Sequence, residues 1–171
     1  MSKRDLKNYL SELNHQQIQE QILDLYGKFP EVKTYYDFVF NPNEEKLIRE
    51  AKVKISYEYF PVKAKRPKMR RSVAQKILKH FINLGVDNFM IADLMLYNVE
   101  LGLTFSAINR IKMDSFYKSF FNSFVQSVSF MIEKGILDSF FDRIQKIVLD
   151  AANQGWRNHP EFSAVVERFD Y

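Results

Sequence analysis

The chain has 171 residues, 46% of them hydrophobic and 27% charged, with 16 Phe and 9 Tyr but only 5 Gly and 5 Pro. This composition excludes disordered, collagen-like and linker-like chains, and the absence of cysteine excludes a disulfide framework and thiolate metal sites. The formal net charge of +4 is uneven, because residues 59–86 carry eight Lys or Arg and no Asp or Glu. The remainder of the chain then has 17 cations and 21 carboxylates, or a charge of −4.

Helix-period spacing of apolar residues predicts an all-α protein, a single domain over residues 1–171 with a basic linker at about 61–71. Residues 53–60 alternate like a strand for several positions, but the spacing around them favours a helix running through. The predicted helices, in chain order, cover 3–12, 15–27, 31–40, 43–59, 72–84, 88–104, 115–134, 138–154 and 161–169.

Glycines mark four predicted helix ends, because glycine tolerates the left-handed conformation of the residue after a helix. They are Gly27, Gly85, Gly135 and Gly155. Around Gly85 and Gly135 the order is the same: a helix, Gly, an apolar residue, then an Asp positioned to cap the next helix, Asp87 or Asp138. Both joints predict tight helical hairpins. An irregular bundle of antiparallel hairpins is therefore favoured over an α-solenoid-like stack.

Helix 88–104 has apolar residues on all sides, which predicts a buried central helix. Helix 115–134 instead carries one apolar stripe, which predicts a surface helix with one side facing the core. The stripe consists of Phe116, Phe120, Phe124, Val128 and Met131.

The beginning of the chain and its apolar runs predict a cytoplasmic protein. The first residues, Met-Ser-Lys-Arg-Asp-Leu-Lys-Asn, are charged and no apolar stretch follows them, which argues against a secretory signal. No uninterrupted apolar run exceeds four residues, so none approaches the roughly 20 needed to cross a bilayer.

Several stretches resemble a family of small uncharacterised bacterial proteins. The stretches are Tyr35-Tyr-Asp-Phe-Val-Phe-Asn-Pro-Asn-Glu-Glu-Lys-Leu, Tyr59-Phe-Pro, Ser72-Val-Ala-Gln-Lys-Ile-Leu-Lys-His-Phe, Leu84-Gly-Val-Asp, Ile91-Ala-Asp-Leu-Met-Leu-Tyr-Asn-Val-Glu-Leu-Gly-Leu and Gly155-Trp. The resemblance covers most of the chain. It implies one helical domain of unknown function, with no catalytic residues to carry over.

The basic segment is the first candidate site. Its cations could bind phosphates, an acidic protein or a membrane surface, or could form a solvated linker that pairs with acidic helices of the same chain. The residues are Lys63, Lys65, Arg66, Lys68, Arg70, Arg71, Lys76 and Lys79. A helix-turn-helix reading of 72–84 and 88–104 is disfavoured, because the second helix offers Asp and Glu where DNA needs cations. Nucleic acid would therefore bind without sequence preference.

The second candidate site is a pair of carboxylates in the apolar helix 88–104. At 100° and 1.5 Å per residue, Asp93 and Glu100 lie about 20° and about 10 Å apart, with Tyr97 near the same edge. One hypothesis is a pocket that uses them with His80 as base or ligand; the alternative is buried ion pairs with Arg70, Arg71 or Arg110. The three histidines are too far apart to predict a metal site.

The sequence contains no nucleophile elbow, phosphate-binding loop or dinucleotide fingerprint. We therefore expect a non-enzymatic interaction module with a basic surface at 63–79 and no cofactor. The partner is unknown, with an acidic protein and nucleic acid as the two candidates, and the oligomeric state stays open. A small-ligand-binding protein or enzyme that uses the Asp93 and Glu100 site is the alternative, and sequence-tolerant nucleic-acid binding is the second alternative.

Overall fold

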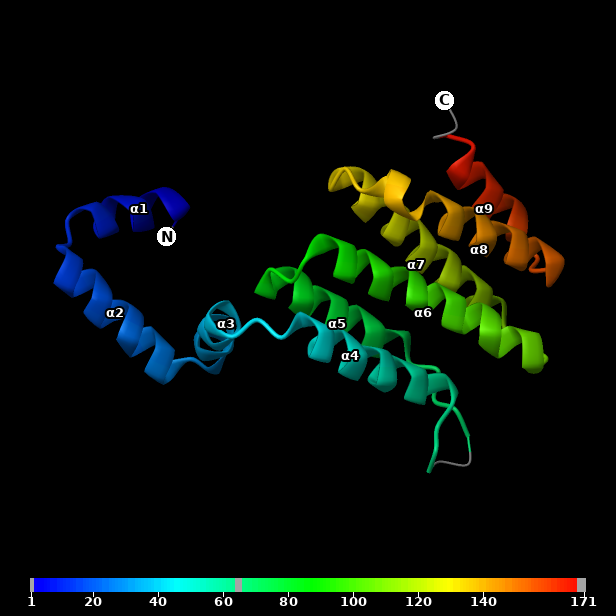
Figure 1. The fold of residues 1–171 in the computed structure, drawn as a ribbon, viewed down its shortest axis with the longest axis horizontal. Coiled ribbons are helices and arrows are strands. Elements are labelled where there is room, and N and C mark those ends of the chain that lie inside the picture. Colours follow the sequence, from blue (N-terminus) through cyan, green and yellow to red (C-terminus); the bar gives the residue numbers. More distant parts are fainter. Residues whose placement is uncertain (1, 64–65, 169–171) are drawn as a thin grey trace. The chain divides into compact units, whose positions relative to one another are not determined.

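The computed structural model (Figure 1) describes residues 2–63 and 66–168, and within these ranges the chain forms helices and no strand. The predicted all-α class is confirmed, and residues 53–59 lie in a helix. The chain divides into two compact units, one ending at Asn43 and the other beginning at Glu44. The N-terminal unit holds α1 (Lys3–Ser11), α2 (His15–Lys28) and α3 (Pro30–Phe40). The C-terminal unit holds α4 (Glu44–Tyr59), α5 (Arg71–Leu84), α6 (Asn88–Ile108), α7 (Asp114–Glu133), the 3-10 turn η1 (Leu137–Phe140), α8 (Phe141–Asn153) and α9 (His159–Val166).

The N-terminal unit is organised by helix caps, polar contacts and aromatic contacts around Tyr36 rather than by a buried core. Reciprocal capping boxes start α1, through Ser2 and Asp5, and α2, through Asn14 and Gln17. Tyr26 at the end of α2 donates a 2.8 Å hydrogen bond to Asp37 of α3. No residue between 2 and 43 is buried.

The predicted helix end at Gly27 is wrong, because α2 continues through this residue to Lys28. Pro30 begins α3, and a residue before proline is restricted to extended backbone. Phe29 accordingly has φ −117° and ψ 111°, so the proline rather than the glycine sets the boundary.

The C-terminal unit is built around α6, which packs against α4, α5, α7 and α8 (Figure 1). Most of its side chains are buried, as the apolar residues on all sides predicted. Among the described residues, α6 is also the one helix long and apolar enough to cross a membrane by length and composition. Counting uninterrupted apolar residues did not predict this, because Asp93, Asn98 and Glu100 interrupt the apolar sequence of the helix. Within its most apolar stretch, 61% of the residues are buried inside the protein.

The stripe on α7 is buried as predicted and joins an aromatic core. Trp156, which follows α8, is 2% exposed and packs its indole against Phe116, Phe120 and Phe162. Gly102 of α6 makes room for this core, since a Cβ atom there would lie 2.5 Å from the ring of Phe120.

Both predicted helical joints contain a left-handed glycine, Gly85 with φ 81° and Gly135 with φ 67°. In each joint the N–H of the following apolar residue bonds back to the helix, Val86 to the Phe81 carbonyl and Ile136 to the Met131 carbonyl. Asp87 caps α6 as predicted. Asp138 does not cap α8, because it lies inside the 3-10 turn.

Three predicted helices have a limit that differs from the structure by more than one residue. Predicted helix 88–104 continues to Ile108, since no Gly or Pro stops it and Phe105 still faces the core. Predicted helix 138–154 begins as the separate turn η1. The last helix starts at His159, with Pro160 in its first turn, and its predicted end at 169 lies outside the described residues.

Candidate functional site

Asp93 and Glu100 lie in a cluster of charged side chains that joins three helices. Arg143 of α8 donates from Nη1 to Asp93 Oδ1 at 2.6 Å, and from Nε and Nη2 to the two oxygens of Glu100 at 2.5 and 2.7 Å. Lys52 of α4 lies 2.6 Å from Asp93 Oδ2 and 5.2 Å from the ring centre of Tyr97. We call Lys52, Asp93, Tyr97, Glu100 and Arg143 the carboxylate cluster.

The carboxylate cluster is electrically balanced, with two carboxylates and two cations. Burial alone would raise the pKa of the Asp93 carboxyl, but the hydrogen bonds from Lys52 and Arg143 outweigh burial and hold that pKa below its usual value. The bonds to Glu100 raise the pKa of Arg143. Both oxygens of Asp93 are occupied by cations, which disfavours a role as proton acceptor.

The predicted ion-pair partners of the two carboxylates are wrong. Neither Arg70, Arg71 nor Arg110 bonds to Asp93 or Glu100, because Arg143, some 43–50 positions further along the chain, fills this place. A signal existed in the sequence. Arg143 stands four residues before Ile147, which is buried, so it interrupts the apolar stripe of α8 with a charge.

His80 is not part of the carboxylate cluster. It lies on α5 and lines a different hollow, of about 260 Å³, with Leu47, Lys54 and Ile77. The structure therefore brings Asp93, Tyr97 and Glu100 to one edge of α6, as their spacing predicted, but leaves His80 elsewhere. Among the described residues, no group of three or more His, Asp or Glu side chains could hold a metal ion.

The basic segment forms the loop between α4 and α5, and one acidic side chain braces it. Glu58, in the last turn of α4, accepts from Arg70 Nε at 2.9 Å, from Nη2 at 2.7 Å and from the Arg70 backbone N–H at 3.2 Å. Its carbonyl also accepts from the Met69 N–H at 2.9 Å. The hydrogen bonds from Arg70 lower the pKa of Glu58 although its carboxylate is buried.

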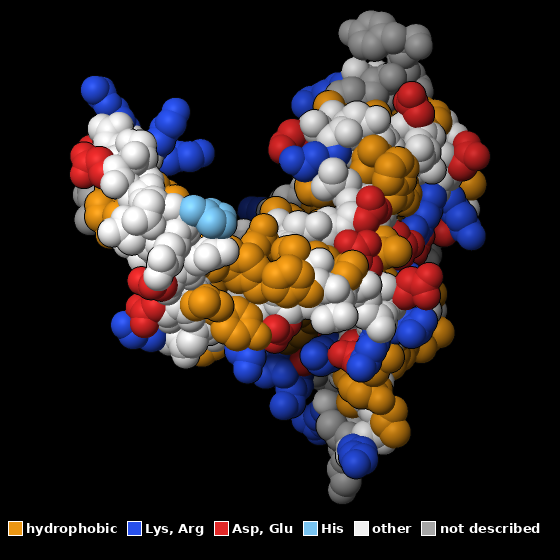
Figure 2. All heavy atoms as spheres, turned by 60° about the vertical axis from the view of Figure 1, so that its left-hand side comes forward, with side chains coloured by type: hydrophobic (Ala, Val, Ile, Leu, Met, Phe, Trp, Pro, Cys, Tyr) orange, Lys and Arg blue, Asp and Glu red, His pale blue; other side chains and the backbone are white. Residues whose placement is uncertain are grey.

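The other described cations of the segment are exposed or half-exposed. Lys63, Arg66, Lys68, Lys76 and Lys79 are exposed, Arg71 is half-exposed, and Lys65 lies outside the described residues. Of the described cations in the segment, Arg70 is the one that forms a salt bridge. Figure 2 shows Lys and Arg side chains gathered toward the lower end of the view, where the 61–70 loop lies in Figure 1.

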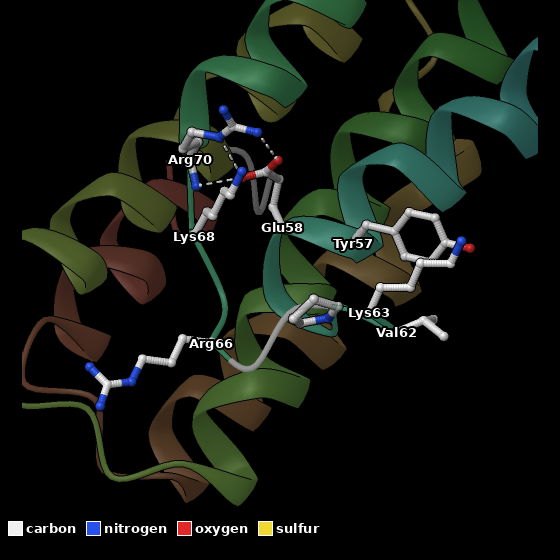
Figure 3. A pocket seen from close by; sticks show the side chains of 8 residues that line it. Tyr57, Glu58, Val62, Lys63, Arg66, Lys68 and Arg70 are labelled. Carbon is white, nitrogen blue, oxygen red and sulfur yellow. Dashed lines mark hydrogen bonds and ion pairs between the residues drawn. The ribbon is translucent and has the colours of Figure 1, made fainter.

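A hollow of about 460 Å³ opens beside this loop (Figure 3). Tyr57, Pro61 and Val62 form an apolar part of its wall, and Tyr57 and Val62 are 52% and 79% exposed. Four cations and one carboxylate complete the lining: Lys63, Arg66, Lys68, Arg70 and Glu58. We call this the basic hollow. Sequence reasoning identified its cations but missed Tyr57, Glu58 and Val62, because they belong to the end of α4 and its exit.

The model of a family described as "Family of unknown function (DUF6155)" matches residues 1–170. No curated protein and no solved structure matches the chain.

Proposed function

We propose that this chain, which belongs to the DUF6155 family of unknown function, is a non-enzymatic interaction module that binds an acidic segment of another protein through the basic hollow and the cations at 63–79. The observation that carries the proposal is that Lys63, Arg66 and Lys68 are exposed beside an apolar wall and form no salt bridge within the described residues. Such a group destabilises the folded chain when no partner is bound, because like charges close together repel each other.

The composition of the basic hollow supports a protein partner. Nucleic-acid backbones are recognised mainly by cations, with aromatic side chains for stacking. Here Val62 and Pro61 add an aliphatic surface beside Tyr57, which suits a hydrophobic side chain set between carboxylates. We therefore favour an acidic peptide segment that carries one or two apolar residues.

The bracing of the loop supports binding as well. The contacts from Glu58 fix both the backbone and the side chain of Arg70, so the end of the loop is held before a partner arrives. A pre-ordered loop loses less conformational entropy on binding than a free one.

The carboxylate cluster gives less support to an enzyme or small-ligand site. Asp93 does border a shallow hollow of about 490 Å³, together with Ile48, Phe89 and Phe140. Its two oxygens are nevertheless held by Lys52 and Arg143, and the histidine that the hypothesis required lies on another face. We infer that the carboxylate cluster has a structural role and holds α4, α6 and α8 together.

The test is binding of the purified full-length chain to three labelled probes over a salt series. The probes are a peptide alternating Glu with Leu and Phe, a mixed-sequence single-stranded DNA, and the same DNA as a duplex. A variant with Lys63→Gln, Arg66→Gln and Lys68→Gln removes three cations of the basic hollow but keeps the brace. We expect this variant to lose roughly tenfold or more in peptide affinity, since about 0.5 kcal/mol per charge adds to more than 1.4 kcal/mol.

The matched control changes three exposed cations on other surfaces, Arg110→Gln, Lys112→Gln and Lys118→Gln. Its affinity for the peptide should stay at the wild-type value. Tighter binding to DNA than to peptide, with a log–log salt slope near −0.9 per duplex phosphate contact, would instead support the nucleic-acid alternative. No binding to any probe at low salt would contradict the proposal.

A further inference from the structure

The first helix presents an apolar stripe that nothing in its own unit buries. Leu6, Tyr9 and Leu10 follow each other at i, i+3 and i+4, and they are 48%, 47% and 36% exposed. A unit of about 40 residues is at the lower limit for burying a core of its own. The stripe of α1 is therefore open to a surface outside the N-terminal unit.

The same helix is basic. It carries three cations, Lys3, Arg4 and Lys7, and one carboxylate, Asp5, which is bonded to the backbone N–H of Ser2 in the capping box. Among the described residues none of the three cations forms a salt bridge. Thus α1 combines an apolar stripe with a net charge of +2.

A groove of complementary character lies between α8 and α9. It has a volume of about 610 Å³, and Val148, Leu149, Ala152 and Val166 contribute apolar side chains to it. Leu149 is 59% exposed, although it is a large aliphatic residue on a helix whose opposite face is core. An exposed apolar groove of this kind is typical of a helix-binding surface.

The rim of this groove is acidic on balance. Asp142 at the start of α8 and Glu167 at the end of α9 border it with one cation, Lys146. Neither carboxylate forms a salt bridge within the described residues. The charge of the groove is therefore opposite to that of α1, and its apolar surface matches the apolar stripe of that helix.

We infer that α1 of one copy binds in the α8–α9 groove of a second copy, and that the protein forms a dimer in this way. Each chain carries one helix and one groove, so two copies related by a two-fold axis satisfy both contacts and leave no end open. The stripe of α1 supplies the anchors, and the cations at its start face the carboxylates of the rim. This inference is independent of what the basic hollow binds.

The first test is the mass of the full-length chain by sedimentation equilibrium across the micromolar range. Wild type should show twice the chain mass of 20.4 kDa. Leu10→Asp in α1 and Leu149→Asp in the groove should each reduce it to the chain mass. Leu23→Asp is the matched control, because Leu23 is 69% exposed and lies on α2 rather than α1. It should remain dimeric, and circular dichroism should show unchanged helix content in all three variants.

A pair of charge-reversal variants distinguishes binding of α1 to a second copy from binding of α1 to its own chain. One variant carries Lys3→Glu and Lys7→Glu, and the other carries Asp142→Lys and Glu167→Lys. Each alone should be monomeric, since helix and rim then have the same sign. Mixed in equal amounts they should form a heterodimer, because each helix then meets a groove of opposite charge.

Two results would overturn the inference. Wild type could be a monomer throughout the concentration range, or Leu10→Asp and Leu149→Asp could dimerise as well as Leu23→Asp. If wild type is a monomer and Leu10→Asp speeds amide hydrogen exchange in α8 and α9, the partner of α1 is the groove of its own chain.

Discussion

Arg70 closes the basic loop onto Glu58 with a two-pronged side-chain contact and a third bond from its own backbone N–H. The Glu58 side chain is 9% exposed, whereas that of Arg70 is 54% exposed. A buried carboxylate thus holds a loop of cations at the surface. The bond between the Met69 N–H and the Glu58 carbonyl continues this contact through a residue with a positive φ of 51°.

Removing the charge of Glu58 should free the loop. We expect Glu58→Gln to reduce the local opening free energy at Arg70 by about 1–2 kcal/mol, because charge-assisted bonds become neutral ones. Amide hydrogen exchange at Met69 and Arg70 should then be roughly 5–30 times faster. Glu45→Gln is the control, since Glu45 pairs with Arg49 where both side chains are more than 70% exposed. Equal exchange at Arg70 in the two variants would contradict the brace.

Removing Arg143 should destabilise the C-terminal unit. Arg143→Met keeps the aliphatic stem but leaves Asp93 and Glu100 half-buried without their shared cation. We expect the free energy of unfolding to fall by about 1–3 kcal/mol, less than for a fully buried pair because about a third of each side chain is exposed. Urea denaturation followed by circular dichroism measures it. Arg49→Met, at an exposed pair, should cost less than about 0.5 kcal/mol.

Acid should weaken the protein through the same groups. The pKa values of Asp93 and Glu58 are lowered in the folded chain. The unfolded chain therefore binds more protons than the folded chain as the pH falls, and acid favours unfolding. Their contribution is complete above the unfolded pKa values, near 4, and is lost as the pH decreases through the folded ones. Urea midpoints between pH 7 and pH 3 should decrease in wild type. The cost of Arg143→Met should shrink over the same range, and a constant cost would contradict the ion pairs.

Adding one methyl group at Gly102 should be harmful despite the better helix propensity of alanine. The propensity gain is about 1 kcal/mol, but the new Cβ would lie 2.5 Å from the buried Phe120 ring, which has little room to move. Overpacking of this kind costs about 1–3 kcal/mol. We expect Gly102→Ala to lower the thermal midpoint. Gly27→Ala, within α2 and with open space around it, should leave it unchanged or raise it.

The sequence by itself determined most of the secondary structure, because helix period, caps and stops are local. Apolar residues on all sides identified α6 as buried, and Gly85 and Gly135 marked the turns where a left-handed backbone is needed. Spacing also placed Asp93, Tyr97 and Glu100 on one edge of α6. At Gly27 this local reasoning failed, since the stronger restriction came from Pro30 two positions after the helix end.

Only the tertiary structure decided which charges meet. Arg143 reaches Asp93 and Glu100 because α6 and α8 pack side by side, and Lys52 joins them because α4 packs on the same helix. The eight cations of the segment looked alike in the sequence, yet Arg70 alone of those described became a structural brace, since Glu58 lies within its reach in the last turn of α4. Helix formation depends on neighbours in the chain, whereas ion pairs and grooves depend on helices brought together from distant parts of it.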